Sequence, residues 1–214
     1  MINDEISIVA ASRTAVASLG KSLKNTPADS LGSKVIVDQL KKTSFKKNEI
    51  DEVIFGQVLT NNCGQNPARQ ASIKAGLSIE TPAYIVNQVC GSGLRSVILG
   101  YQSILAGNSR IVISGGQESM SLSPHSANLR NGKKLGDIQL IDTMIKDGLW
   151  DAFHGYHMGV TAENVAEKFQ ITRKEQDKFA FNSQKKALKA QKTDRFKEEI
   201  INYKIKSDNA EVKF

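Results

Sequence analysis

The amino-acid sequence predicts an α/β fold, in which a layered, mostly parallel mixed sheet carries helices on both faces. One observation is that short apolar segments alternate with longer segments whose apolar residues recur at helical spacing, up to about residue 118. A second is that this alternation implies right-handed crossovers between parallel strands. A third is size, because 214 residues of which 40% are hydrophobic can bury a core between a sheet and its helices.

Each strand is predicted from a short apolar run beside a turn signal. The first run contains Ile6, Ile8 and Val9, and the third follows the turn pair Thr81 and Pro82. The four predicted strands cover residues 5–11, 53–58, 83–89 and 110–114.

The helices between these strands are predicted from spacing and from end signals. Asp29 or Ser30 can cap the first helix, Pro67 suits the first turn of the second, and Gly107 ends the third. The predicted helices run from about residue 29 to 42, 67 to 76 and 92 to 106.

The regular spacing of apolar residues ends after residue 118. Residues 119–160 show little periodicity, which predicts a long loop excursion, and such excursions are usually functional or contact surfaces. We therefore divide the chain into an α/β core, residues 1–118, and a second part, residues 119–214, without a linker between them.

Two helices and a strand are expected after the excursion. Helical spacing resumes over residues 161–169, and Thr172 and Glu175 have the spacing of a capping box for a helix that ends near Thr193. The apolar residues of the segment 196–205 suggest one strand that returns to a sheet edge.

Composition narrows the classes of function. The net charge is +7, and residues 168–206 hold twelve Lys or Arg against five Asp or Glu. Aromatic residues that could stack on bases are not interleaved with them, so we expect a solvated lysine-rich face and no nucleic-acid partner, with attraction of a phosphorylated ligand as the alternative.

No apolar run approaches the roughly 20 residues of a membrane span. The acidic start at Asp4 and Glu5 is unlike a secretory or transit signal, which favours a cytoplasmic protein.

The cysteines and histidines do not predict a metal site. Cys63 and Cys90 are expected to be reduced thiols. His125, His154 and His157 are not clustered with them, and no recognised metal-binding spacing occurs.

Cys90 is the strongest candidate for a reactive side chain. It stands between the predicted strand 83–89 and the helix that follows, where unpaired N–H groups and the helix dipole favour a thiolate. Open α/β sheets also bind ligands beyond the carboxyl ends of their strands. A lone cysteine more often serves in packing. Gly91 and Gly93, which let a ligand approach the backbone, and the neighbouring Asn87 favour a nucleophile.

Two other motifs are excluded at this position. A hydrolase elbow requires a glycine where Cys90 stands, two residues before Ser92. A dinucleotide fingerprint requires a third glycine where Ser96 stands.

Four segments carry a resemblance to a known family. Residues 87–97, Asn-Gln-Val-Cys-Gly-Ser-Gly-Leu-Arg-Ser-Val, resemble the acyl-accepting cysteine segment of the thiolases, and specifically of the acetyl-CoA acetyltransferases among them. Residues 64–70 resemble the family's dimer-contact segment, residues 115–121 its post-strand signature, and residues 148–158 part of its coenzyme A loop. The resemblance spans the chain and implies the fold of a thiolase-like N-terminal half.

The resemblance implies a reaction and a set of site residues. Cys90 would accept an acetyl group from acetyl-CoA, and a second acetyl-CoA would attack the thioester to give acetoacetyl-CoA and CoA, reversibly. CoA and acetyl-CoA are then substrates, with no prosthetic group. Leu149, His157 and Met158 match positions that line the pantetheine part of CoA. From the residues alone, packing of His157 among neighbouring aromatic side chains is an equally good interpretation, and packing is favoured for the other two.

The sequence also departs from the family. Thiolases resemble two copies of one α/β half, and the second half brings a Gly-His-Pro histidine, an asparagine and a Cys-x-Gly-Gly-Gly cysteine, none of which occurs before Phe214. We therefore expect an acetyl-CoA C-acetyltransferase of thiolase type that is inactive or nearly so by itself. It would be a homo-oligomer, dimer or tetramer, or would take the C-terminal half from a partner. The alternative is a non-catalytic CoA-binding or assembly subunit, or the product of a truncated gene.

Overall fold

A parallel sheet of three strands forms the centre of the computed structural model, which describes residues 5–202. The middle strand pairs with both neighbours, and Val53 lies opposite Ala83 on one side and Ile113 on the other. In the order β2-β1-β3, the strands are β1 (Glu52–Gly56), β2 (Ala83–Val86) and β3 (Val112–Gly116).

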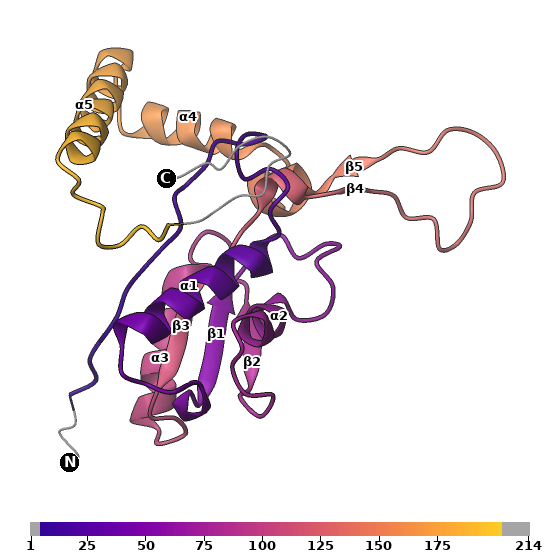
Figure 1. Cartoon of the computed structure of the whole chain (residues 1–214). Coiled ribbons are helices and arrows are strands. Elements are labelled where there is room, and N and C mark those ends of the chain that lie inside the picture. The colour runs from indigo at the N-terminus through magenta and orange to yellow at the C-terminus, as the bar shows by residue number, and fades with distance from the viewer. Residues whose placement is uncertain (1–4, 203–214) are drawn as a thin grey trace.

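Helices cover both faces of this sheet, which confirms the predicted fold class. Figure 1 shows α1 (Ala28–Lys42) and α2 (Pro67–Lys74) in front of the sheet and α3 (Ser92–Leu105) behind it. Successive side chains of a strand point to opposite faces. Val53 and Phe55 accordingly join α1 and α2 in the main core, whose other members include Ile36, Ala68, Ala71 and Ile113.

Helix α3 meets the sheet through small residues. Its buried residues are Ser92, Ser96 and Gly100, whereas Leu94 and Leu105 are 70% and 64% exposed. Small side chains let the helix backbone approach the strands closely, and the apolar residues predicted from the helical spacing therefore face away from the sheet.

Two polar side chains tie the core elements together. Asp51, just before β1, accepts hydrogen bonds from the backbone N–H groups of Ile111 (2.9 Å) and Arg110 (2.7 Å), and these bonds lower the pKa of its carboxyl group. Asn66, at φ +43°, caps α2 by accepting from Arg69 N–H at 3.1 Å, and its amide donates to the carbonyl of Ala83 at 2.8 Å. These bonds fix β1 to β3 and α2 to β2.

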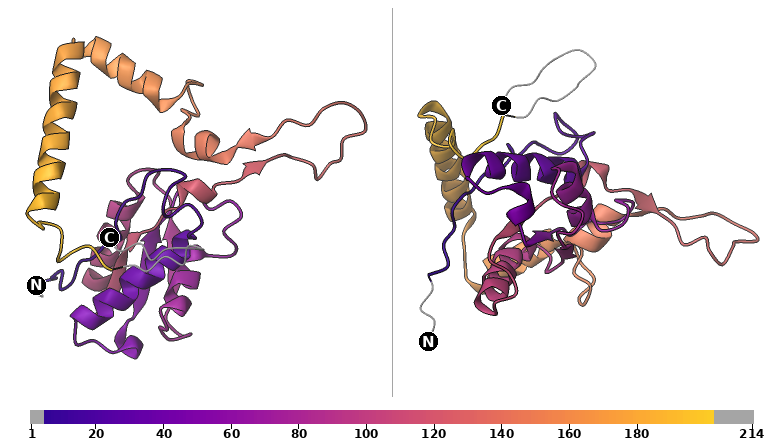
Figure 2. Two further views of the ribbon diagram at one scale, coloured as in Figure 1. Left: turned by 45° about the horizontal axis from the view of Figure 1, so that its top comes forward. Right: turned by 60° about the horizontal axis from the view of Figure 1, so that its bottom comes forward.

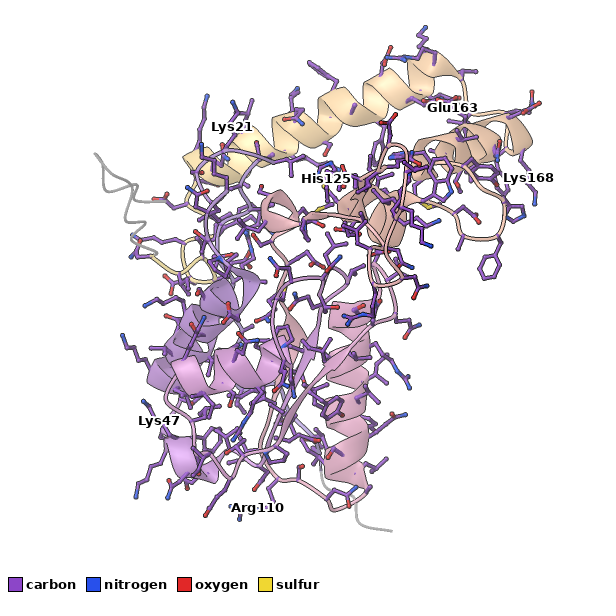
Figure 3. All side chains as sticks on the ribbon, turned by 90° about the vertical axis from the view of Figure 1, so that its right-hand side faces the viewer. Lys21, Lys47, Arg110, His125, Glu163 and Lys168 are labelled. Carbon is purple, nitrogen blue, oxygen red and sulfur yellow. The ribbon has the colours of Figure 1, made fainter. Side chains whose placement is uncertain are left out.

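The excursion leaves the sheet at the carboxyl ends of the strands. Figure 3 shows Lys47 and Arg110, which precede β1 and β3, at one end of the molecule and His125 at the other. The excursion contains a short antiparallel pair and a π-helix, and two helices follow as an arm that extends away from the sheet (Figure 2). Their bounds are β4 (His125–Ser126), β5 (Ile141–Asp142), the π-helix Ile145–Leu149, α4 (Met158–Lys168) and α5 (Arg173–Lys192). Two 3₁₀ turns complete the described elements, at Lys47–Glu49 and Met120–Leu122.

The arm makes little contact with the core. No residue of α4 is buried, and Ala190 is the buried residue of α5. The predicted capping box is confirmed, since Thr172 Oγ1 accepts from Glu175 N–H at 3.3 Å and the Glu175 carboxylate accepts from Thr172 N–H at 2.8 Å.

The predicted strand over residues 5–11 is wrong. These residues form no strand in the structure, and Ile8 and Val9 are 81% and 64% exposed. Residues 6–10 border a cavity of about 300 Å³ together with β3 and α3. The alternation of apolar residues favours an extended chain, but a strand also requires a hydrogen-bonded neighbour, and residues 5–11 have none within the range 5–202.

A segment near the start of the described residues meets one near their end. Arg13 forms a single parallel bridge with Ile200, supported by a 2.7 Å ion pair between Arg13 and Glu199. Of the strand predicted over residues 196–205, the described part is a turn that ends in this bridge, and the rest lies outside the described residues.

The predicted cap of α1 is also wrong. The helix begins at Ala28 after Pro27, and neither Asp29 nor Ser30 caps it. Because Asp29 lies inside the first turn, its buried carboxylate instead forms an ion pair with Lys74 of α2. The other predicted elements of the core agree with the structure to within a few residues.

Candidate active site

Cys90 lies in a tight turn between β2 and α3. The N–H of Gly91 donates to the carbonyl of Gln88 (3.1 Å), and the N–H of Ser92 donates to that of Val89 (3.1 Å). Gly91 is the N-cap residue of α3, so the helix begins directly after the cysteine, as the sequence predicts. The Cys90 side chain is exposed to solvent.

The residue before Cys90 is held in an unfavourable conformation. Val89 has φ +48°, which is rare for a β-branched residue. Three side-chain hydrogen bonds surround it. Ser92 Oγ donates to the Val89 carbonyl (2.6 Å) and accepts from Gln88 N–H (2.8 Å), and Asn87 Oδ1 accepts from Val89 N–H (2.9 Å). The turn that carries the thiol is therefore fixed by its neighbours on both sides.

Glycines at the strand ends allow α3 to reach this position. A Cβ at Gly56, the last residue of β1, would lie 2.5 Å from Gly93 N and 2.7 Å from Ser92 Cβ. A Cβ at Gly116, the last residue of β3, would lie 3.4 Å from Gly93 Cα. The first turn of α3 thus rests on two glycines, and Cys90 projects from the carboxyl edge of the sheet. Sequence reasoning missed this role, although the glycine within the apolar run 53–58 and those directly after the run 110–114 were the available signal.

Glu118 joins the loops that follow β1 and β3. Its two carboxylate oxygens accept from the N–H groups of Val58 (2.9 Å) and Leu59 (3.1 Å). Burial raises the pKa of this carboxyl group, against the opposing effect of those two bonds. Glu118 belongs to the segment 115–121, and its two hydrogen bonds give it a structural role at this edge of the sheet.

Cys90 has no basic partner among the residues that the structure describes. Its Sγ makes no hydrogen bond in the range 5–202. His125 lies 3.8 Å from the carboxylate of Asp142, and His154 lies 3.2 Å from that of Asp151. Both histidines are therefore placed against carboxylates of the excursion.

Leu149, His157 and Met158 come together at the base of one loop. Trp150 and His157 form an antiparallel bridge that closes the loop between them, so Leu149 and Met158 lie next to each other just outside that loop. Leu149 is the last residue of the π-helix, a structure that is frequent at functional sites. His157 caps α4, because its Nδ1 accepts from Gly159 N–H at 3.0 Å. This hydrogen bond gives His157 a structural role, and no described hydrogen bond joins the loop to the candidate nucleophile.

The second cysteine has a different environment. Cys63 is half-buried beside a cavity of about 330 Å³, and Gln57 Nε2 lies 3.5 Å from its sulfur. Burial raises the pKa of the Cys63 thiol. A raised pKa and partial burial both disfavour reaction at this sulfur.

The part of the chain that the structure describes contains neither a cluster of metal ligands nor a helix able to span a membrane. Over residues 5–202 no three of the potential ligands His, Cys, Asp and Glu come close enough together to hold a metal ion. In the same range no helix combines the length and the apolar character needed to cross a membrane.

Comparison with known families identifies the chain. The family model for the thiolase N-terminal domain matches residues 6–214. This chain is a member of the thiolase family. Acetyl-CoA acetyltransferase of Rhizobium meliloti is 54% identical over 212 residues, which are 99% of this chain and 54% of the relative. The protein of the same name from Paracoccus denitrificans is 55% identical over 204 residues, 95% of this chain and 52% of the relative.

A mammalian relative shows similar agreement. The rat protein named acetyl-CoA acetyltransferase, cytosolic, is 48% identical over 205 residues, 96% of this thiolase chain and 52% of the relative. The chain thus spans about half the length of the curated relatives it matches.

Proposed function

We propose that these residues form the nucleophile-bearing part of an acetyl-CoA C-acetyltransferase, with Cys90 as the acetyl acceptor. The observation that carries the proposal is an exposed cysteine, held in a fixed turn directly before α3, in a chain of the thiolase family. The names of the bacterial and mammalian relatives support the choice of acetyl-CoA.

The chemistry has two steps. The Cys90 thiolate attacks the thioester carbonyl of acetyl-CoA, a new S–C bond forms, and CoA leaves as a thiolate that takes up a proton. A second acetyl-CoA, deprotonated at its methyl group, then attacks the acetyl-cysteine. Acetoacetyl-CoA forms, and the Cys90 thiolate is released. The same steps in reverse are thiolysis.

Coenzyme A would lie along the loop that carries Leu149, His157 and Met158. Support comes from their position at the two ends of one loop beyond the carboxyl ends of the strands, where α/β sheets bind ligands. Met158 is 38% exposed, so an apolar surface is available to the pantetheine chain. Acetyl-CoA enters as a substrate, and the proposal includes no prosthetic group.

We infer further that these 214 residues alone give little or no turnover. The nucleophile has no described base, and the relatives are about twice as long. The missing acid–base groups would come from a C-terminal half, in a partner chain or a longer form of this one, and the assembly would be a dimer or tetramer. We also place the protein in the cytoplasm, in keeping with the word cytosolic in the name of the rat relative.

The outward face of α3 supports the need for a covering partner. Leu94, Tyr101 and Leu105 are each at least half exposed on a helix whose small residues already occupy the sheet side. In light scattering the chain should therefore self-associate, and Leu94→Lys should reduce that association. A monodisperse monomer would contradict this part of the proposal.

Mass spectrometry tests the assignment of Cys90. Incubation with acetyl-CoA should place an acetyl group on the peptide that contains Cys90, and Cys90→Ser should abolish it. An acetyl adduct would support the enzyme. Its absence, with CoA binding retained, would instead support the alternative of a non-catalytic CoA-binding or assembly subunit or of a truncated gene product. Full acetoacetyl-CoA synthesis by the purified 214 residues would contradict the proposed lack of turnover.

A further inference from the structure

Ser92 is a buried serine whose hydroxyl is used entirely on the turn that carries Cys90. It is 3% exposed. Its Oγ donates to the carbonyl of Val89 at 2.6 Å and accepts from the N–H of Gln88 at 2.8 Å. The two groups that it joins belong to the two residues immediately before the cysteine.

This hydroxyl opposes a relaxation that the backbone would otherwise favour. Val89 at φ +48° is in an unfavourable conformation that persists only where the surroundings enforce it. Rotation of Val89 to an ordinary extended conformation would move its carbonyl group, and with it the Cα–Cβ bond of Cys90. The Val89 carbonyl accepts from both the hydroxyl and the N–H of Ser92, so that rotation would break two bonds.

The other face of Ser92 is fixed by the sheet. A Cβ at Gly56 would lie 2.7 Å from Ser92 Cβ, which shows how closely β1 packs against this residue. Ser92 therefore connects the end of β1 to the two residues that precede Cys90. Asn87 adds a bond to the Val89 N–H, but its side chain is exposed and has no such support.

We propose that Ser92 is the positioning residue of Cys90. Its hydroxyl holds the turn so that the sulfur stays at the N-terminal end of α3, where the positive end of the helix dipole and the free N–H groups of the first turn attract negative charge. Ser92 does not touch the substrate. Its importance for acyl transfer rests on the proposed function, whereas its effect on the cysteine can be measured without any turnover.

Ser96 provides a matched control. It is also a buried serine of α3, one turn further on, and its hydroxyl donates to the carbonyls of Gly115 (2.6 Å) and Gly93 (2.7 Å) instead of to the turn. Ser92→Ala and Ser96→Ala thus remove the same group from the same helix with comparable burial. They differ in whether the lost bonds reach Cys90.

The test is the rate at which iodoacetamide alkylates Cys90, followed by peptide mass spectrometry. Ser92→Ala should slow the reaction about two- to fivefold, the size of a helix-terminus effect on a charged group. Ser92→Thr, which keeps a hydroxyl, should restore the rate, and Ser96→Ala should leave it unchanged. Equal rates for Ser92→Ala and the wild type, equal slowing by Ser96→Ala, or failure of Ser92→Thr to restore the rate would overturn the proposal.

A measurement on the wild-type chain covers the case in which Ser92→Ala does not fold. The N–H of Gln88, an exposed residue, should exchange with solvent slowly because it is bonded to the buried hydroxyl. Fast exchange of this proton would overturn the proposal. Slow exchange and a slowed alkylation, together with no acetylation of the wild type by acetyl-CoA, would leave the positioning role intact and would refute the proposed function instead.

Discussion

The substitution Gly56→Ala tests how the first turn of α3 is seated on the sheet. Gly56 ends β1, and an added Cβ would lie 2.5 Å from Gly93 N and 2.7 Å from Ser92 Cβ, with the carbonyl carbon of Ser92 closer still. Most of these atoms are backbone, so they can move only if α3 itself moves. The change should therefore displace the turn that carries Cys90.

The expected loss of stability is large for a single methyl group. Overpacking of a core costs about 1–3 kcal/mol, and we expect the upper end, about 3 kcal/mol, because no flexible side chain can give way. In a chain of this size each kcal/mol lowers the melting temperature by about 2–4 °C, so the shift should be about 6–12 °C. Thermal and urea unfolding followed by circular dichroism measure both quantities.

Gly93→Ala is the matched control. Gly93 lies in the first turn of α3, and nothing stands within 4 Å of the Cβ that would be added. Alanine is the better helix former by about 0.5–1 kcal/mol, so this variant should be as stable as the wild type or more so. If Gly56→Ala unfolded at the wild-type midpoint, the close contact between β1 and α3 would be refuted.

Three further predictions concern other residues of the core. The depressed pKa of Asp51 means that its stabilisation is present at neutral pH, above the unfolded pKa of about 3.9, and is lost as the pH falls through the lower folded value. Asp51→Asn should thus lower the free energy of unfolding at pH 7 by about 1 kcal/mol in urea titrations. Below about pH 4, the free energy of unfolding of the variant should decrease less with falling pH than that of the wild type. An unchanged acid transition would contradict this. Asn66→Ala should cost about 2 kcal/mol, since it loses a helix cap at a left-handed residue, and Asn66→Gly should cost less; equal losses would contradict the conformational argument. Iodoacetamide should label exposed Cys90 before half-buried Cys63, as judged by peptide mass spectrometry, and the reverse order would contradict the assigned environments.

The position of the candidate nucleophile Cys90 could be predicted from local sequence. An apolar run, a cysteine, two glycines and a helical repeat stand within about twenty consecutive residues, so their order alone places Cys90 at the start of a helix. The capping box of α5 was predictable for the same reason, because Thr172 and Glu175 are three residues apart and bond to each other.

The supports of that cysteine were not predictable in this way. Gly56 and Gly116 lie far from Ser92 in the chain, and their role appears only when parallel pairing puts both strand ends under α3. The apolar face of α3 was visible as a helical repeat. Which side meets the sheet was decided by Ser92, Ser96 and Gly100, whose small size permits a closer approach.

The sequence by itself determined the fold class, the positions of most core helices and strands, and the position of the cysteine just before α3. All of these depend on residues that are neighbours in the chain. Tertiary structure alone decided that residues 5–11 pair with no other strand of the described chain, that Asp29 forms an ion pair with Lys74 instead of capping α1, and that Val89 is held in a rare conformation. Each of these depends on a partner that is distant in the sequence or on the geometry of a packed turn, and a pattern of residue types along the chain does not specify either one.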